Sequence, residues 1–361
     1  MLELPVWNES ERQECIDEFI ERTREQVGAE IDAERWHSQV NADQADVWVN
    51  GMGDANPRWD PHSPGDEVHP TYVVSIASPG MVFGAPMSTP LENLIGRLEV
   101  EWDEPLRLGD SDLNGIVSLD DVTHKERGDK SYVFLTGTGE YRRGEERIAE
   151  ASTTLIRTPV EGLQEERDIY EYSDDELDEI QSLYESELDR IAGEPPTPEI
   201  DDLTEGDELP TIVRGPLTVA DMVSWNAAIG PSYGAHLHNY VERKEAPDGT
   251  VANPKTGWVQ KDSHQHEDFL LAEQRGMPLP FANGENMWAL TAPLVTNWMG
   301  SDGFLKRHTT ELEKPYFYGD ILHLDGEIVG LDGFDASVTV EWEAINPLDE
   351  AVITGSSTVL L

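Results

Sequence analysis

The sequence SHQHED, residues 263–268, brings two histidines and two acids together within six residues. An imidazole and a carboxyl group can exchange protons near neutral pH, because the unperturbed pKa of histidine is about 6.5. The same side chains are common ligands of zinc and iron. A third interpretation is a solvated helix start in a very acidic protein. The chain then passes through a stretch with glycine and proline to Asn283-Gly284, where turns and a new helix start are favoured.

A second pattern favours a metal site. The spacing of the first cupin motif is matched by Gly230, His236, His238, Glu242 and Gly249. Two imidazoles and a carboxylate could bind non-haem iron, manganese or zinc, with His264 or His266 completing the ligand set. A cupin also needs strands around these ligands and a second motif downstream, whereas residues 231–261 are predicted to be an insertion that contains glycine and proline. A metal-dependent enzyme is therefore the alternative prediction.

The composition is that of a folded and strongly acidic protein. The 361 residues suffice for two domains, and 38% hydrophobic residues with 10 Trp can form sizeable cores. A formal charge of -48, from 25 Lys and Arg against 73 Asp and Glu, is typical of proteins that stay soluble in concentrated salt. We therefore expect a protein from the cytosol of a salt-accumulating halophile. No basic face is visible, so nucleic acid is not an expected partner.

Cysteine content and apolar runs exclude further classes. Cys15 is the one cysteine, which excludes an internal disulfide framework and a zinc site built from several thiolates. The N-terminal residues lack the basic-then-apolar pattern of a signal peptide, and no run of 18 apolar residues occurs. We expect a soluble cytoplasmic protein with no membrane partner.

The elements that must position these residues fall into two similar halves. Residues 97–110 and 308–320 both alternate acidic and apolar residues, then contain a proline and end in Gly-Asp. Each segment is followed by a long stretch with the alternation of β-strands. Trp59 lies 51 residues before the aspartate of the first Gly-Asp, and His266 lies 54 residues before that of the second. The matching order and spacing indicate a duplicated α+β unit.

Two helices are predicted outside these repeats. Residues 9–36 have apolar side chains three or four apart, which predicts an amphipathic helix in the N-terminal segment 1–36. Residues 173–191 begin with a serine N-cap and a glutamate three residues later, the pattern of a capping box. The acidic, proline-rich sequence that follows cannot continue a helix, so residues 161–210 are predicted to be a linker.

Four stretches of the sequence resemble one enzyme family. GDANPRWD, GDELPTIVRGPLTVADMVSW, HEDFLLAEQRGMPLPFANG and LVTNWMGSDGFLKR occur in the order typical of MaoC-like acyl dehydratases and (R)-specific enoyl-CoA hydratases. The chain resembles the form of this family with two hot-dog domains. The resemblance implies a tandem hot-dog fold of the α+β class, in which each antiparallel sheet wraps around a central helix. These helices are expected to follow Pro70 and Gly284.

The same resemblance divides the chain. Residues 37–160 are the expected first hot-dog domain, which is non-catalytic, and residues 161–210 are the helical and proline-rich linker. Residues 211–361 are the expected second, catalytic domain, with an insertion near 231–261.

The resemblance also implies a reaction, the addition of water to a 2-enoyl thioester or its reverse, with no cofactor. His266 matches the histidine of the family and would transfer the proton. Gly284 matches the glycine at the start of the central helix, whose backbone N–H would stabilise the enolate. The simplest members have an aspartate five residues before the histidine, but Lys261 has that place here. Asp262 is the first candidate for the acid partner and Asp268 the second.

The first copy departs from the family at the catalytic position. Asp54 and Asn56-Pro57 match the family motif, but Trp59 replaces the histidine, and tryptophan cannot act as a base. This half is therefore predicted to form part of the acyl or pantetheine tunnel. The predicted substrate-binding residues are Asn283, Trp59, Arg58, Asn297 and Trp298. Cations that could bind the phosphates of CoA are Arg58, Arg97, Lys306, Arg307 and Lys314.

The predicted partner is an acyl-CoA or acyl-carrier thioester. Two hot-dog units on one chain predict an intramolecular pseudo-dimer, which could pair further into a homodimer. A non-catalytic subunit of a hydratase complex and a thioesterase are the remaining alternatives, since the same fold hosts several functions.

Overall fold

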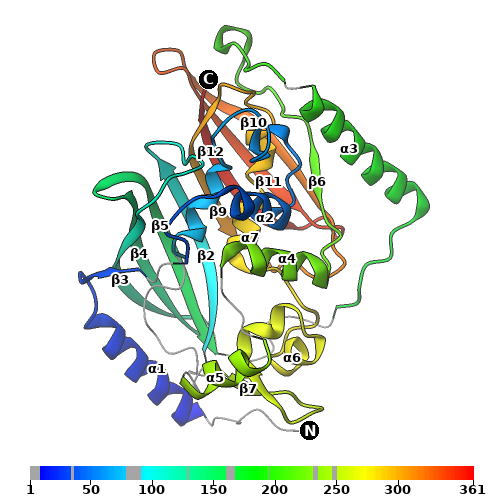
Figure 1. Cartoon of the computed structure of the whole chain (residues 1–361). Coiled ribbons are helices and arrows are strands. Elements are labelled where there is room, and N and C mark those ends of the chain that lie inside the picture. Colours follow the sequence, from blue (N-terminus) through cyan, green and yellow to red (C-terminus); the bar gives the residue numbers. More distant parts are fainter. Residues whose placement is uncertain are drawn as a thin grey trace.

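In the part of the chain that the structure describes, ten strands form one antiparallel sheet (Figure 1). The computed structural model describes residues 9–33, 36–78, 91–127, 130–159, 167–193, 195–230, 235–245 and 250–361. The strands of the first half are β1 (Glu30–Asp32), β2 (Leu91–Trp102), β3 (Leu113–Arg127), β4 (Lys130–Arg143) and β5 (Glu146–Pro159). Those of the second half are β6 (Ile212–Arg214), β9 (Phe304–Leu312), β10 (Leu322–Asp332), β11 (Ser337–Ile345) and β12 (Ala351–Leu360). A separate pair consists of β7 (Thr250–Ala252) and β8 (Val259–Lys261).

The two halves of the sheet have the same strand order. Read outward from the centre, β2-β5-β4-β3-β1 corresponds to β9-β12-β11-β10-β6. β2 and β9 pair across the centre, from Arg97 opposite Glu311 to Glu101 opposite Arg307. These strands lie in the two repeated segments of the sequence, so the predicted duplication is confirmed, and its two copies share one sheet.

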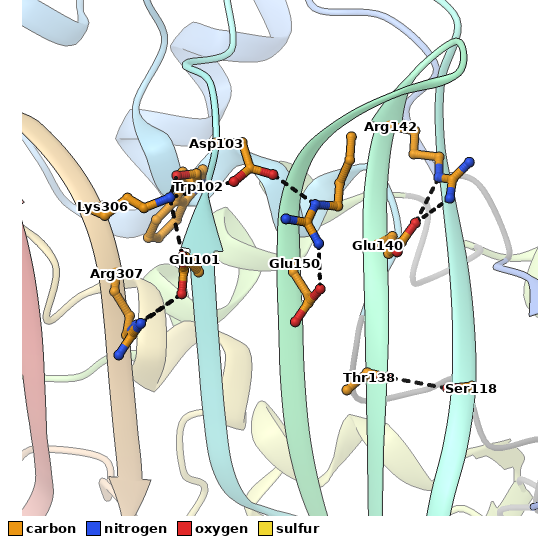
Figure 2. A network of polar contacts seen from close by, with 11 residues as sticks. Glu101, Trp102, Asp103, Ser118, Thr138, Glu140, Arg142, Glu150, Lys306 and Arg307 are labelled. Carbon is orange, nitrogen blue, oxygen red and sulfur yellow. Dashed lines mark hydrogen bonds and ion pairs between the residues drawn. The ribbon is translucent and has the colours of Figure 1, made fainter. Parts of the chain in front are cut away.

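Ion pairs connect the two halves at this central seam (Figure 2). The Arg307 guanidinium on β9 donates to Glu101 on β2 at 2.8 Å, and the Lys306 ammonium lies 3.2 Å from the same carboxylate. Lys306 also lies 3.5 Å from Asp103. All four groups are partly exposed, and exposed ion pairs contribute only about 0–1 kcal/mol each. The ion pairs therefore add little to stability, and the buried hydrophobic core, which contains residues of both halves, contributes more to their association.

Two equivalent helices pack against each other, one from each half. They are α2 (Ala42–Met52) and α4 (Val219–Ile229). Trp48 and Trp225, each four residues before the end of its helix, have ring centroids 5.1 Å apart. Gly51 allows the close approach, because a Cβ atom there would lie 2.5 Å from the Cβ of Ala228. The helix pair therefore repeats the approximate twofold relation of the strands.

A buried helical segment lies at the centre of each half. In the second half it comprises α7 (Gly284–Ala289) and α8 (Pro293–Thr296). Proline cannot donate the backbone hydrogen bond of a continuing helix, and Pro293 interrupts the segment as predicted. The short 3-10 helix η2 (Pro70–Ser75) has the equivalent place in the first half, and Thr71–Ser75 are buried. Helix starts after Pro70 and at Gly284 were the sequence-based expectation.

The remaining helices are peripheral or short. They are α1 (Glu9–Arg24), α3 (Asp174–Ala192), α5 (Leu237–Glu245), α6 (Phe269–Gln274), and the 3-10 helices η1 (Pro57–Trp59), η3 (Ile200–Asp202) and η5 (Asp262–His266). The predicted capping box opens α3. The helix predicted for residues 9–36 is too long: it ends at Arg24, Gly28 has a φ of +80°, and Ile31 then pairs with Val117 as part of β1. Among the described residues, no helix has the length and apolar character needed to cross a membrane.

Candidate active site

His266 is the last residue of η5, and its ring is held by the segment that precedes the central helix. Nδ1 lies 2.7 Å from the carbonyl oxygen of Phe281, and the His266 and Phe281 ring centroids are 4.6 Å apart in an edge-on contact. A carbonyl oxygen can only accept, so Nδ1 carries the hydrogen and Nε2 is left as the basic nitrogen. Burial lowers the pKa of His266 to about 4. The imidazole is therefore neutral at physiological pH and can accept a proton at Nε2.

Gly284 is the first residue of α7, three residues after Phe281. The Asn283 side chain caps the helix by accepting from the Asn286 N–H at 2.8 Å. No described residue accepts a hydrogen bond from the Gly284 N–H. Three residues span at most about 11 Å of chain, so His266 contacts the chain within about 11 Å of Gly284. Asn283 lies between the contacted residue and Gly284, so three predicted site residues belong to this segment or contact it.

The first half of the chain contributes one wall of this site. A Cβ atom at position 284 would lie 2.8 Å from the side chain of Ile95 on β2, so only glycine fits there without rearrangement. Nearby on the same strand, Glu92 accepts a buried hydrogen bond of 2.8 Å from Arg275. Ser78 donates to the buried carboxyl group of Glu285, the residue after Gly284. The site therefore forms where the two halves meet.

The two predicted acid partners differ in what the structure describes. Asp268 is the N-cap of α6, and its Oδ1 accepts from the N–H groups of Leu270 and Leu271 at 2.9 and 3.3 Å. Its carboxylate is thus used to start a helix, and no hydrogen bond among the described residues joins it to His266. Asp262 begins η5, but its side chain lies outside the described part of the structure.

Glu267, which follows His266 directly, was not predicted as a site residue. Asn226 on α4 donates a hydrogen bond to its carboxyl group. Burial raises the pKa of Glu267 to about 7, an effect that the hydrogen bond from Asn226 partly offsets. A pocket of about 720 Å³ lies beside it, lined among others by Val223, Asn226 and Ala227 of α4 and by His264, Glu267 and Phe269. Glu267 stands between His266 and Asp268 in the sequence, but the family pattern His-x-Asp directed the prediction to Asp268.

Asn297, another predicted substrate-binding residue, belongs to a second cluster, around Asp54. Asn297 is fully buried, donates to Asp54 at 3.3 Å and to Glu187 at 2.9 Å, and accepts from Asn56 at 2.8 Å. The carboxylate of Glu187 in turn accepts two hydrogen bonds from Arg214, at 2.8 and 2.9 Å. No hydrogen bond among the described residues connects this cluster to His266.

Arg58 and Trp59 border the same cluster. Arg58 donates to the Gly300 carbonyl at 2.7 Å and to Glu67 at 3.1 Å, and its guanidinium lies 4.4 Å from the centre of the Trp59 ring. Trp59 is buried and contacts His69 edge-on at 5.2 Å. Trp298, the remaining predicted residue, is partly buried against the hydrophobic core.

The predicted phosphate-binding cations are all paired with carboxylates. Arg97 contacts Glu99 and Glu311, and Lys314 contacts Glu350. Lys306 and Arg307 form the seam in Figure 2, and Arg58 pairs with Glu67. A phosphate at any of these cations would have to bind beside a carboxylate or displace it.

The alternative metal pattern lies on a helix. His236 immediately precedes α5, and His238 is within it, rather than on the strands that a cupin needs. Within the described residues, no group of three or more His, Cys, Asp and Glu side chains could hold a metal ion. Gly249 and the side chain of Glu242, which also belong to this pattern, lie outside the described part of the structure.

No protein-family model matches the sequence, and no curated protein matches it. Solved structures do resemble it. A MaoC-like dehydratase aligns with a TM-score of 0.62 at 17% identity, covering 93% of this chain and 99% of the other. A MaoC-like dehydratase from Phytophthora capsici gives 0.54 at 12% identity, with 94% and 97% covered. A conserved hypothetical protein from Mycobacterium tuberculosis, described as having a double hotdog fold, gives 0.51 at 11% identity, with 92% and 96% covered.

At these identities the likeness concerns the fold. The shared architecture extends over almost the whole of each chain and includes both halves of the sheet. The chain therefore has the tandem hot-dog fold that the sequence predicted.

Proposed function

We propose that the protein is a hydro-lyase that adds water to a 2-enoyl thioester of CoA or of an acyl carrier, or catalyses the reverse reaction. The observation that carries the proposal is the 2.7 Å contact between His266 Nδ1 and the Phe281 carbonyl oxygen, three residues before Gly284. An imidazole with Nε2 free to accept a proton, held on the segment that leads into a helix start, supports the proposal. The likeness in fold to proteins named MaoC-like dehydratases is consistent with it.

The reaction needs a base, a proton donor and a group that stabilises the thioester oxygen. In the proposal, Nε2 of His266 takes a proton from water as the water oxygen forms a bond to the β-carbon. The electrons of the double bond move towards the thioester carbonyl, whose oxygen accepts from the Gly284 N–H. Such a donor contributes about 2.7–4 kcal/mol in other enzymes. Protonation of the α-carbon completes the addition of one water molecule.

The first half is proposed to be non-catalytic. Trp59 has no basic nitrogen, and Pro70 at the start of η2 has no N–H to donate. The hydrogen bonds of Arg58 and Asn297 favour a role in joining the halves over the role in substrate binding that the sequence predicted. Asp262 is the proposed acid partner of His266, because the carboxylate of Asp268, the second candidate, caps α6.

We also propose that the protein works in the cytosol, in concentrated salt. A formal charge of -48 repels itself unless ions screen it, and the Debye length falls to about 3 Å at 1 M salt. The melting temperature is expected to rise steadily from dilute buffer to molar potassium chloride. Equal melting temperatures across that range would contradict this part of the proposal.

The direct test is hydration of a panel of 2-enoyl-CoA thioesters, short to long, in molar potassium chloride. Loss of the absorbance of the conjugated thioester reports the reaction. We expect His266→Ala to lower kcat by about 10²–10⁴-fold, the usual contribution of general acid–base catalysis. The matched control is His62→Ala, which removes an exposed imidazole from the first half.

The products separate the alternatives. A 3-hydroxyacyl thioester supports the hydro-lyase, whereas a free CoA thiol without it would indicate a thioesterase. Hydration at the wild-type rate by His266→Ala would refute the mechanism, and no reaction of the wild type with any member of the panel would refute the proposed function.

A further inference from the structure

The pocket beside Glu267 is not used by the mechanism described so far. Its volume of about 720 Å³ lies within the range of about 300–1,000 Å³ that is usual for small-molecule sites. Val223, Ala227 and Phe269 supply apolar walls, and Asn226 and Glu267 supply polar groups. An apolar pocket with a few convergent polar groups is the common form of a substrate site. Glu267 brings its carboxyl group to this pocket from the position next to His266.

The equivalent helices α2 and α4 are followed by different sequences: an acidic residue comes two positions after the end of α2 but not of α4. In the first half, Met52 ends α2, and the sequence continues Gly53-Asp54. In the second half, Ile229 ends α4, and the sequence continues Gly230-Pro231. The second half thus has proline in the sequence position where the first half has an acid. That half is the one that contains the candidate base.

Glu267 returns a carboxyl group to the end of α4 from another segment. Its partner Asn226 lies in the last turn of α4, one residue after Trp225, which is equivalent to Trp48 of α2. In the first half, Asp54 lies 3.8 Å from the imidazole of His69. In the second half, Glu267 is the chain neighbour of His266 and caps the end of η5. In each half, therefore, a carboxyl group lies near the end of the paired helix: Asp54 in the first half and Glu267 in the second.

We infer that Glu267 is a catalytic residue of the proposed hydro-lyase, the acid that protonates the α-carbon while His266 deprotonates water. The inference rests on the proposed function. The water O–H bond breaks, its proton goes to Nε2 of His266, and the oxygen bonds to the β-carbon as the π bond breaks. The Glu267 O–H bond breaks, and its proton goes to the α-carbon. Imidazolium and carboxylate remain, and transfer of one proton from His266 to Glu267 through solvent restores both.

The ionisation of the pair suits these roles. Burial raises the pKa of Glu267 to about 7, so its acid form is present near neutral pH. Burial lowers the pKa of His266 to about 4, so its base form is present over the same range. Two groups whose environments move their pKa values apart in this way are a recurrent basis of acid and base assignments.

The test compares Glu267→Gln, Glu267→Asp and wild type on the best enoyl-CoA of the panel. Gln keeps the shape and an oxygen that can accept from Asn226, but it cannot give a proton. We expect kcat to fall by about 10²-fold or more, with KM changed less than about threefold. Asp keeps a carboxyl group on a side chain that is one methylene shorter. Its kcat should therefore be at least about tenfold higher than that of Glu267→Gln. The matched control is Glu273→Gln, an exposed glutamate on α6, which should match wild type.

The outcomes separate this inference from the proposed function. Retention of kcat by Glu267→Gln, with His266→Ala inactive, would overturn the inference and leave the hydro-lyase standing. A rise in KM with kcat unchanged would also overturn it, since Glu267 would then only bind substrate. Were the Gln variant not to fold, Glu267→Asp decides: a fall in kcat without a change in KM supports the inference, and wild-type kcat overturns it. Absence of hydration by wild type would refute the proposed function itself.

Discussion

The central helical segments of the two halves start at equivalent positions but with different residues, Pro70 in the first half and Gly284 in the second. Before each helix start, one residue forms an isolated antiparallel β-bridge. Glu67 pairs with Arg107 in the first half, and Phe281 pairs with Phe317 in the second. Three residues after these bridges come Pro70 and Gly284. By this register, His69-Pro70 corresponds to Asn283-Gly284. Proline removes the N–H that glycine leaves available, so the first start cannot act as an oxyanion donor.

The surroundings of the two starts differ in the same sense. In the second half, the His266 imidazole contacts the segment that leads into Gly284, and a pocket lies beside the neighbouring residue Glu267. At Pro70, His69 is fully buried between Trp59 and Asp54. Under the proposed function, the duplicated scaffold keeps one copy for chemistry and uses the other to hold the two halves together.

The largest expected effect on stability comes from the buried pair Glu187–Arg214 in the cluster around Asp54. Both side chains are at least 92% buried, and the pair also binds Asn297. Glu187→Ala leaves the Arg214 charge without its partner, which should lower the free energy of unfolding by about 3–5 kcal/mol. Denaturant unfolding in high salt measures it. The control Glu101→Ala removes a partly exposed acid of the seam and should cost only about 0–1 kcal/mol. Equal losses would contradict the role of the buried cluster.

Introducing a histidine at the family position of the first copy is expected to lower stability by a smaller amount and to add no hydratase activity. Trp59→His gives this half an imidazole at the family position but leaves Pro70 without an N–H. We expect no added hydratase activity in a His266→Ala background, and a loss of stability of about 3 kcal/mol from the emptied site. Enoyl-CoA hydration and thermal unfolding check both parts. Activity regained by this double variant would show that the first half needs only a base.

The pH dependence should follow the two groups of the second half. His266 must be neutral, and its pKa of about 4 makes activity rise as the pH increases through that value. Glu267 must be protonated, and its pKa of about 7 makes activity fall as the pH increases further. The charged or titratable neighbours in the same segment are His264, His266 and Asp268, and Asn226 faces it from α4. We expect a bell-shaped profile of kcat/KM with limbs near these values, and loss of the upper limb in Glu267→Gln.

The features that the sequence predicted correctly are those determined by local patterns. The repeated segments became β2 and β9, the capping box opened α3, and Pro293 interrupted the central helix. The family motif selected His266 and Gly284, and His266 contacts the segment that leads into Gly284. These features depend on hydrogen-bonding patterns and periodicity that lie within short stretches of chain.

The parts that could not be predicted depend on contacts between distant residues. Asn226 meets Glu267 across 41 positions and Glu92 meets Arg275 across 183, and neither pairing has a signature in the sequence. Asp268 matched the family pattern, but in three dimensions its carboxylate caps α6. The raised pKa of Glu267 likewise comes from burial, which only the packed structure defines.

The central claim, that the Gly284 N–H stabilises the developing oxyanion, has one direct test. An Ile95→Ala background makes room for a side chain at position 284. In it, Gly284→Ala keeps the N–H and Gly284→Pro removes it, and proline is accepted at the first position of a helix, as at Pro70. The account predicts that kcat for enoyl-CoA hydration in the proline variant is about 10²–10³-fold below that in the alanine variant. Equal kcat values in two folded variants would contradict it.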